Sequence, residues 1–178
     1  MAQAESLDEI ELMRLQVLKY DDDGRPIGRS SGPGLVAPLV NGTALAVNAW
    51  HDGVVGSGLA IPYEVVAPPS QHWLGQPDPA WSGPGGVVFL TMDSEVGDPL
   101  PGGLRAFMTF TGDLVTWRLV NIVGWQADHQ PLYREYLTYR FDRPPYETLI
   151  AELPSSPVYD WTAELLINKQ WWAAVLGG

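Results

Sequence analysis

The sequence contains no cysteine among its 178 residues. Disulfide frameworks, cysteine-ligated zinc or iron–sulfur sites and thiol nucleophiles are therefore excluded. It also lacks any run of about 20 apolar residues, the length that a helix needs to cross a bilayer. The first residues, MAQAESLDEIELMR, carry acids where a signal peptide has a basic start and an apolar run. We therefore expect a protein of the cytoplasm, or one held within a virion or similar particle, and not a secreted one.

Positive charge is scarce, and lysine is the scarcest source of it. Ten basic residues, of which only Lys19 and Lys169 are lysines, stand against 21 acidic ones, so the formal net charge is −11. Such a chain repels phosphate backbones, and we expect no nucleic-acid partner. The same charge favours solubility and suits a basic protein partner.

Apolar residues make up 46% of the chain, which is typical of a globular protein with a core. The length predicts a single domain over residues 1–178. The clearest local signal is LVAPLVNGTALAV, where two apolar runs flank Asn41-Gly42, the pair preferred in type I′ hairpin turns. A second hairpin is predicted where LRAFMTF and LVTWRLVNIVGW flank residues 111–113.

Further strands are predicted from alternation and composition. Apolar and polar residues alternate from Met13 to Val17, and LYREYLTYRF at 132–141 alternates with a high aromatic content. SGLAIPYEVVA at 57–67 and GVVFLTM at 86–92 are short apolar runs that also predict strands.

Helices are predicted toward the two ends of the chain. Ser6 and Glu9 match a capping box, which predicts a short N-terminal helix. RPPYETLIAEL at 143–153 begins with prolines and predicts a helix that ends before Pro154. Asp160 could cap a last helix through WTAELLINKQWWAAVL, with a strand through AELLIN as the alternative.

This order of elements predicts a mainly β or α+β fold. We expect a single antiparallel sheet domain, either a sandwich or a partly open barrel, with a short N-terminal helix and C-terminal helices. The hairpin connections argue against a parallel sheet of βαβ units.

No motif supports a catalytic assignment. Residues 28–32 fit G-x-S-x-G, but neither a strand before Ser30 nor a helix after it is predicted, as a hydrolase elbow requires. Residues 32–37 fit G-x-G-x-x-A, but they open a predicted strand and not a helix. The sequence predicts no cofactor and favours a protein that is not an enzyme.

Two groups of residues leave a binding site open. His51, His72 and His129 each lie beside acids or tryptophan and could converge on a metal, although no pair has ligand spacing, so we predict no metal site and keep them as candidates only. Four arginines lie within predicted strands and could line an anion pocket, although outward arginines that pair with acids across a sheet are commoner. They are Arg105, Arg118, Arg134 and Arg140.

The most distinctive stretch is APPSQHWLGQPDPAWSGPGG, residues 67–86, which combines five prolines and four glycines with two tryptophans. Loops longer than about 12–15 residues are usually functional or disordered. Tryptophan in such a loop either folds back as part of a lid over the sheet or anchors a partner. On the second interpretation, we predict that Trp73, Trp81, His72 and Leu74 bind a partner.

We therefore expect a structural or protein-interaction subunit of a larger homo- or hetero-oligomeric assembly, for example a component of a phage or phage-like particle. An acidic inhibitor or immunity-type protein that neutralises a basic toxin or enzyme is one alternative, because its charge would speed association with such a partner. A small metal- or anion-binding β-barrel enzyme is another. The predicted partners are proteins, and no membrane is expected.

Overall fold

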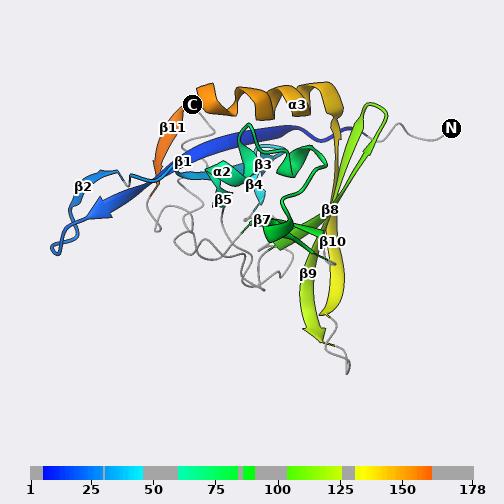
Figure 1. Ribbon diagram of the computed structural model, residues 1–178, viewed down its shortest axis with the longest axis horizontal. Helices are drawn as coiled ribbons and strands as arrows, with labels where there is room; N and C mark the ends of the chain where they lie inside the picture. The colour runs from blue at the N-terminus through cyan, green and yellow to red at the C-terminus, as the bar shows by residue number, and fades with distance from the viewer. Residues whose placement is uncertain are drawn as a thin grey trace.

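Figure 1 shows the computed structural model, which describes residues 6–29, 31–45, 60–83, 86–90, 104–125 and 131–161. Strands dominate these residues and form two sheets, which confirms the mainly β or α+β class. The sheet order closes no barrel among the described strands. No helix in this part of the chain is long and apolar enough to cross a membrane.

The first sheet is built around β1 (Ile10–Tyr20). One edge of β1 pairs antiparallel with β3 (Leu35–Val40), and β1 also pairs antiparallel with β2 (Pro26–Arg29). The other edge pairs in parallel with β11 (Val158–Trp161). All six residues of β3 are buried, so both faces of this strand are covered.

The Asn41-Gly42 turn joins β3 to β4 (Thr43–Ala44), and its φ angles of 53° and 72° are both positive, as a type I′ turn requires. The predicted hairpin is therefore confirmed. The sixth strand of this sheet, β5 (Ile61–Pro62), also pairs with β3.

The second sheet has five strands in the order β10-β9-β8-β7-β6, and all its pairs are antiparallel. In chain order these strands are β6 (Ser82–Gly83), β7 (Gly86–Leu90), β8 (Leu104–Thr111), β9 (Leu114–Trp125) and β10 (Pro131–Asp142). Gly112 and Asp113 connect β8 to β9, which confirms the second predicted hairpin. The predicted strands at 86–92 and 132–141 correspond to β7 and β10.

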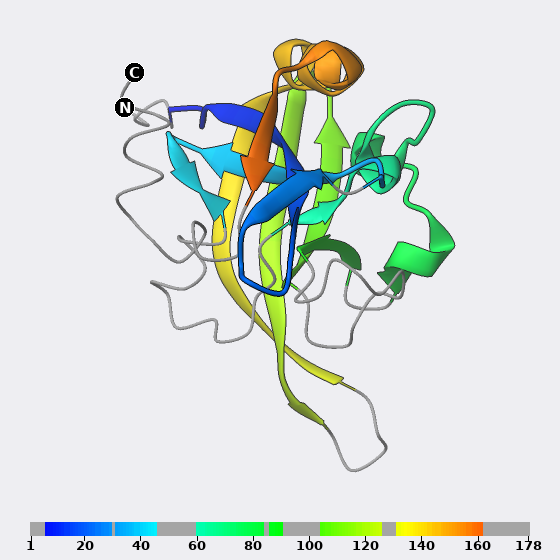
Figure 2. The same ribbon diagram turned by 90° about the vertical axis from the view of Figure 1, so that its left-hand side faces the viewer.

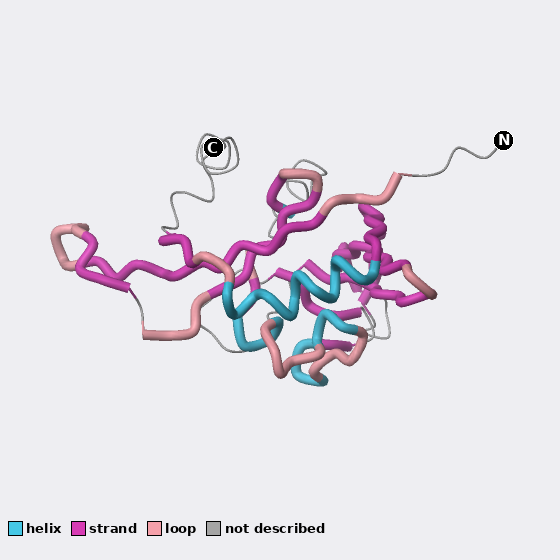
Figure 3. The backbone as a smooth tube through the Cα atoms, turned by 90° about the horizontal axis from the view of Figure 1, so that it is seen from above, coloured by secondary structure: helices cyan, strands magenta, loops and turns pink. Residues whose placement is uncertain are grey.

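The helix α3 (Arg143–Glu152) runs alongside β1 and confirms the helix predicted over 143–153 (Figures 1 and 3). Its start is tied to the β8–β9 turn, because the Arg143 N–H donates to Asp113 O at 2.8 Å. Tyr146, Ile150 and Leu153 are buried at the spacing of one helix face, and a 3-10 turn, η3 (Leu153–Ser155), follows the helix.

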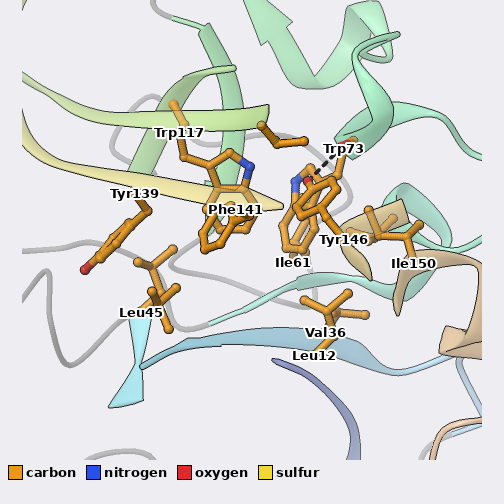
Figure 4. Packing of buried hydrophobic residues seen from close by; sticks show 14 of the residues in the cluster. Leu12, Val36, Leu45, Ile61, Trp73, Trp117, Tyr139, Phe141, Tyr146 and Ile150 are labelled. Carbon is orange, nitrogen blue, oxygen red and sulfur yellow. Dashed lines mark hydrogen bonds between the residues drawn. The ribbon is translucent and has the colours of Figure 1, made fainter. Parts of the chain in front are cut away.

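One hydrophobic cluster joins the two sheets and the helices (Figure 4). Alternate residues of each strand enter it, as a pleated sheet with one core-facing side requires. Its members from the sheets include Leu12, Val36, Val40, Ile61, Ala106, Val115, Trp117, Leu119, Tyr139 and Phe141. The core therefore depends on both sheets, where the sequence predicted one.

The predicted N-terminal helix is wrong. Residues 6–9 have no regular structure and lead directly into β1. Glu9 N–H donates to Asn41 Oδ1 at 3.0 Å, and Asn41 N–H donates to Glu9 O at 2.9 Å. Sheet pairing with the hairpin therefore satisfies backbone groups that a capping box would otherwise have satisfied.

Two other predicted elements differ. The strand expected over 57–67 is limited in the described residues to β5, because the chain turns at Pro62 into a short helix, α2 (Tyr63–Val66), that buries Val65 and Val66 in the core. Asp160 caps no helix, since it lies in β11. The rest of the predicted last helix, 162–176, lies outside the described residues.

Asp8 links the two sheets at the start of β1. Its Oδ2 accepts a hydrogen bond from the Arg140 N–H of β10 at 2.8 Å, and its Oδ1 accepts from Asn41 Nδ2 at 2.9 Å. The Asp8 N–H also donates to Arg140 O at 2.7 Å. One carboxylate thus joins β10 to the β3–β4 turn.

We predict that Asp8→Ala lowers the free energy of unfolding by about 1–3 kcal/mol, because the partly buried Arg140 N–H and the exposed Asn41 amide lose a charged acceptor. Asp8→Asn should retain part of this, since its amide offers one acceptor atom and not two. Urea unfolding measures both, with Asp22→Asn, an exposed carboxylate in the β1–β2 turn, as the control. A loss for Asp8→Ala no larger than for the control would contradict this role.

Candidate functional site

The described part of the distinctive loop, residues 67–83, is an ordered segment that we call the excursion. It contains two 3-10 turns, η1 (His72–Leu74) and η2 (Pro79–Trp81). Asp78 Oδ1 accepts a hydrogen bond from Ala80 N–H at 2.8 Å and caps η2, while proline fills the first position of that turn. The Pro-rich sequence therefore forms turns with their own caps.

Gly75 lies where the excursion packs closely against Phe110 of β8. Its φ is +85°, and a Cβ atom there would lie 3.0 Å from the Phe110 ring. A side chain would be strained by the backbone conformation and by this contact. Glycine is therefore required between η1 and the sheet.

Trp73 inserts from the excursion into the hydrophobic core and is fully buried. Its ring centroid lies 5.6 Å from that of Trp117 on β9, and the Trp117 ring lies 5.8 Å from Tyr146 on α3. The Tyr146 hydroxyl donates to the Trp73 backbone oxygen at 2.8 Å, as the dashed line in Figure 4 shows. One loop residue thus contacts a strand and a helix that are distant in the sequence.

Burial raises the pKa of the Tyr146 hydroxyl well above its usual value of 10.0. The Trp117 side chain acts in the opposite direction, and the negative charge of Glu147 raises the pKa further. The hydroxyl is therefore neutral at pH 7 and donates its proton to the Trp73 carbonyl.

His72 is the fully buried polar side chain of the excursion. Its Nδ1 accepts a hydrogen bond from Asp78 N–H at 3.2 Å, which places the proton of a neutral ring on Nε2. Its own backbone N–H donates to the Ser70 hydroxyl at 3.2 Å, and that hydroxyl donates to Val65 O. The imidazole holds the two 3-10 turns together.

The other two predicted binding residues also face the interior. Trp81 is 7% exposed and belongs to the hydrophobic core, and Leu74 is half-buried and packs against it. All four side chains assigned to a partner therefore contact this chain. Of the two interpretations of the segment, their burial favours the lid, and binding of a partner through them stays a prediction.

A cavity of about 330 Å³ lies between the excursion and β8. His72, Ser82 and Gly83 line one side, and Ala106, Phe107 and Met108 line the other. Among the described residues that line it, His72 supplies an imidazole and Ser82 supplies a hydroxyl. No carboxylate or cationic side chain from this part of the chain lines the cavity with them. This set offers no paired acid and base and no charge for a transition state.

The metal hypothesis rested on three histidines, of which His51 and His129 lie outside the described residues. Within the described ranges, no group of three histidine, aspartate or glutamate side chains could hold a metal ion. The convergence of the three histidines therefore stays untested.

The arginines of the strands do not line a common pocket among the described residues. Arg118 donates to Glu135 across the sheet at 3.0 Å and lies over the Phe107 ring, which is the outward arrangement expected for such residues. Arg105 donates a long bond of 3.4 Å to Gly86 O, and its buried Nε has no hydrogen-bond partner. Arg134 lies exposed on β10, and Arg140 contributes its backbone to the Asp8 link.

No protein-family model, curated protein or solved structure matches this chain. Any function is therefore inferred from the chain's own geometry.

We predict that Tyr146→Phe lowers the free energy of unfolding at pH 7 by about 1–2 kcal/mol, because the buried Trp73 carbonyl loses its donor. Above about pH 10, the Tyr146 hydroxyl ionises in the unfolded chain but not in the folded protein. The unfolded state then binds fewer protons, and the wild type loses stability by up to about 1.4 kcal/mol per pH unit from this group. The difference between wild type and variant should therefore shrink as the pH rises.

Urea unfolding at pH 7, 9, 10 and 11 measures this difference. Tyr159→Phe is the matched control, because Tyr159 is 40% exposed on β11. A gap between wild type and Tyr146→Phe that stays constant from pH 7 to pH 11 would contradict the role assigned to the buried hydroxyl.

Proposed function

We propose that the protein is a non-enzymatic structural or interaction subunit of a larger protein assembly, of which a phage-like particle would be one example. The observation that carries this proposal is a projecting two-stranded ribbon. Figure 2 shows β9 and β10 extending together away from the rest of the described chain. We call residues 121–125 of β9 and 131–134 of β10 the arm.

The pairing of the strands defines where the arm begins. β8 pairs with β9 as far as Val120, opposite Arg105. Beyond that pair, Asn121 pairs with Arg134 and Trp125 with Pro131, and the described strands supply no third strand to either side. An isolated two-stranded ribbon is at best marginally stable in water. Contact with a neighbouring subunit would stabilise it.

The sequence of the arm supports the same function. Five of its nine residues are large and apolar, and one is charged. The apolar ones are Ile122, Val123, Trp125, Leu132 and Tyr133. Tryptophan and tyrosine are enriched among the residues that contribute most of the binding energy of protein interfaces. The β1–β2 turn also projects from the protein, at the left of Figure 1. Unlike the arm, it is polar and contains three consecutive aspartates.

We predict that the full chain forms a complex whose native mass exceeds 19.5 kDa, the mass of one chain. The chain is expressed alone and together with the products of the neighbouring genes in its source genome, and native mass spectrometry measures the species. Replacement of residues 122–133 by Asn-Gly removes the arm and should leave a folded monomer, because the core lies outside the arm.

A second variant keeps the length of both strands. Ile122→Thr with Leu132→Thr preserves β propensity while removing apolar surface, and it should weaken the complex. Ile27→Thr on β2 is the matched control, since Ile27 is 64% exposed outside the arm. A full chain that stays monomeric under all these conditions, or a complex unaffected by both arm variants, would overturn the proposal.

A further inference from the structure

A groove of about 340 Å³ lies between the start of β1 and the junction of β10 with α3. It belongs neither to the arm nor to the cavity beside the excursion. Its apolar lining consists of Leu7, Ile10, Phe141, Pro145 and Tyr146. Leu7 is 50% exposed, so part of this apolar lining is open to solvent.

Four carboxylates line the same groove, and no basic side chain among the described residues lines it with them. They belong to Asp8, Glu9, Glu11 and Asp142. Asp8 is bonded to Asn41 and to the Arg140 N–H, as described above. The side chains of the other three make no hydrogen bond or ion pair with the described chain.

The sequence explains why Asp142 has no partner within the protein. It occupies the N-cap position of α3, where an aspartate normally accepts from the N–H of the second or third helical residue. Those positions are Pro144 and Pro145, which carry no N–H. The carboxylate is therefore left without a capping bond beside the apolar groove.

We propose that this groove docks a basic, amphipathic segment of a protein partner, with an arginine or lysine among the carboxylates and an adjacent apolar side chain against Leu7 and Ile10. Charge complementarity identifies the occupant. An apolar floor favours the alkyl stem of a long basic side chain, and the carboxylates satisfy its charged end. The net charge of −11 attracts such a partner over a longer range. This inference does not rest on the arm.

The test uses two charge-matched triple variants of the full chain. The groove triple is Glu9→Gln, Glu11→Gln and Asp142→Asn. The control triple is Asp22→Asn, Asp23→Asn and Glu64→Gln, three exposed carboxylates outside the groove. Each triple changes the net charge from −11 to −8, since three negative charges are removed. A thermal unfolding scan of each variant confirms that it is folded.

The probes are two fluorescein-labelled peptides of 12 residues, one alternating arginine with leucine and one alternating arginine with serine. Fluorescence anisotropy at physiological salt measures their affinity. We expect the groove triple to weaken binding of the arginine–leucine peptide about tenfold, and the control triple less than about twofold. Leu7→Ser should weaken binding of the arginine–leucine peptide and leave that of the arginine–serine peptide unchanged.

Equal weakening by the two triples would show attraction by net charge alone and would overturn the proposal, as would a lack of binding to the full chain. The variant without residues 122–133 should bind the peptide as the full chain does. A full chain that binds the peptide but stays monomeric would therefore count against the function proposed for the arm. A full chain that assembles but does not bind the peptide would count against the groove.

Discussion

The contact of Trp73 with Trp117 and Tyr146 is the interaction on which the rest of the structure depends. It joins the excursion to β9 of the second sheet and to α3. The three aromatic rings are buried together at this point, and the hydroxyl of Tyr146 donates to the buried Trp73 carbonyl. The excursion is therefore part of the hydrophobic core.

This arrangement separates the interior of the protein from the two surfaces that we propose for interaction. The tryptophans of the excursion stabilise the fold. The arm has an apolar sequence beyond the end of its pairing with β8, and the groove beside β1 is lined by apolar residues and carboxylates. The two surfaces differ in chemistry: the arm is mostly apolar, and the groove is rimmed by acids. The two proposals therefore assign them different contacts.

Turn chemistry was one part of the fold that could be predicted from sequence, beside the helix α3 and the strands β7 and β10. Asn41-Gly42 and Gly112-Asp113 act locally, because positive φ angles are needed whatever surrounds the turn. The start of β1 could not be predicted, since Ser6 and Glu9 fit a helix cap and only pairing with a distant hairpin decides otherwise. The parallel partner β11 lies over 140 positions away from its neighbours in β1, and no local signal marks it.

The site was predictable only in part, for a similar reason. Composition marked residues 67–86 as an unusual segment, but it does not show whether a tryptophan side chain there packs into the core or faces solvent. Tyr146 and Trp117 decide that, and both had the features of ordinary core residues on a helix and a strand. The groove was missed because its carboxylates come from residues 8–11 and 142, which are adjacent only once the two sheets have packed.

Native-state hydrogen exchange tests most directly whether the excursion is part of the core. The Leu74 and Trp81 N–H groups donate to backbone oxygens within the excursion, each at 2.9 Å. If the excursion unfolds only with the whole protein, these amides should exchange with the same free energy and denaturant dependence as those of Trp117 and Leu119 on β9. Exchange at a much lower free energy, without denaturant dependence, would show that the excursion opens alone and would contradict the account.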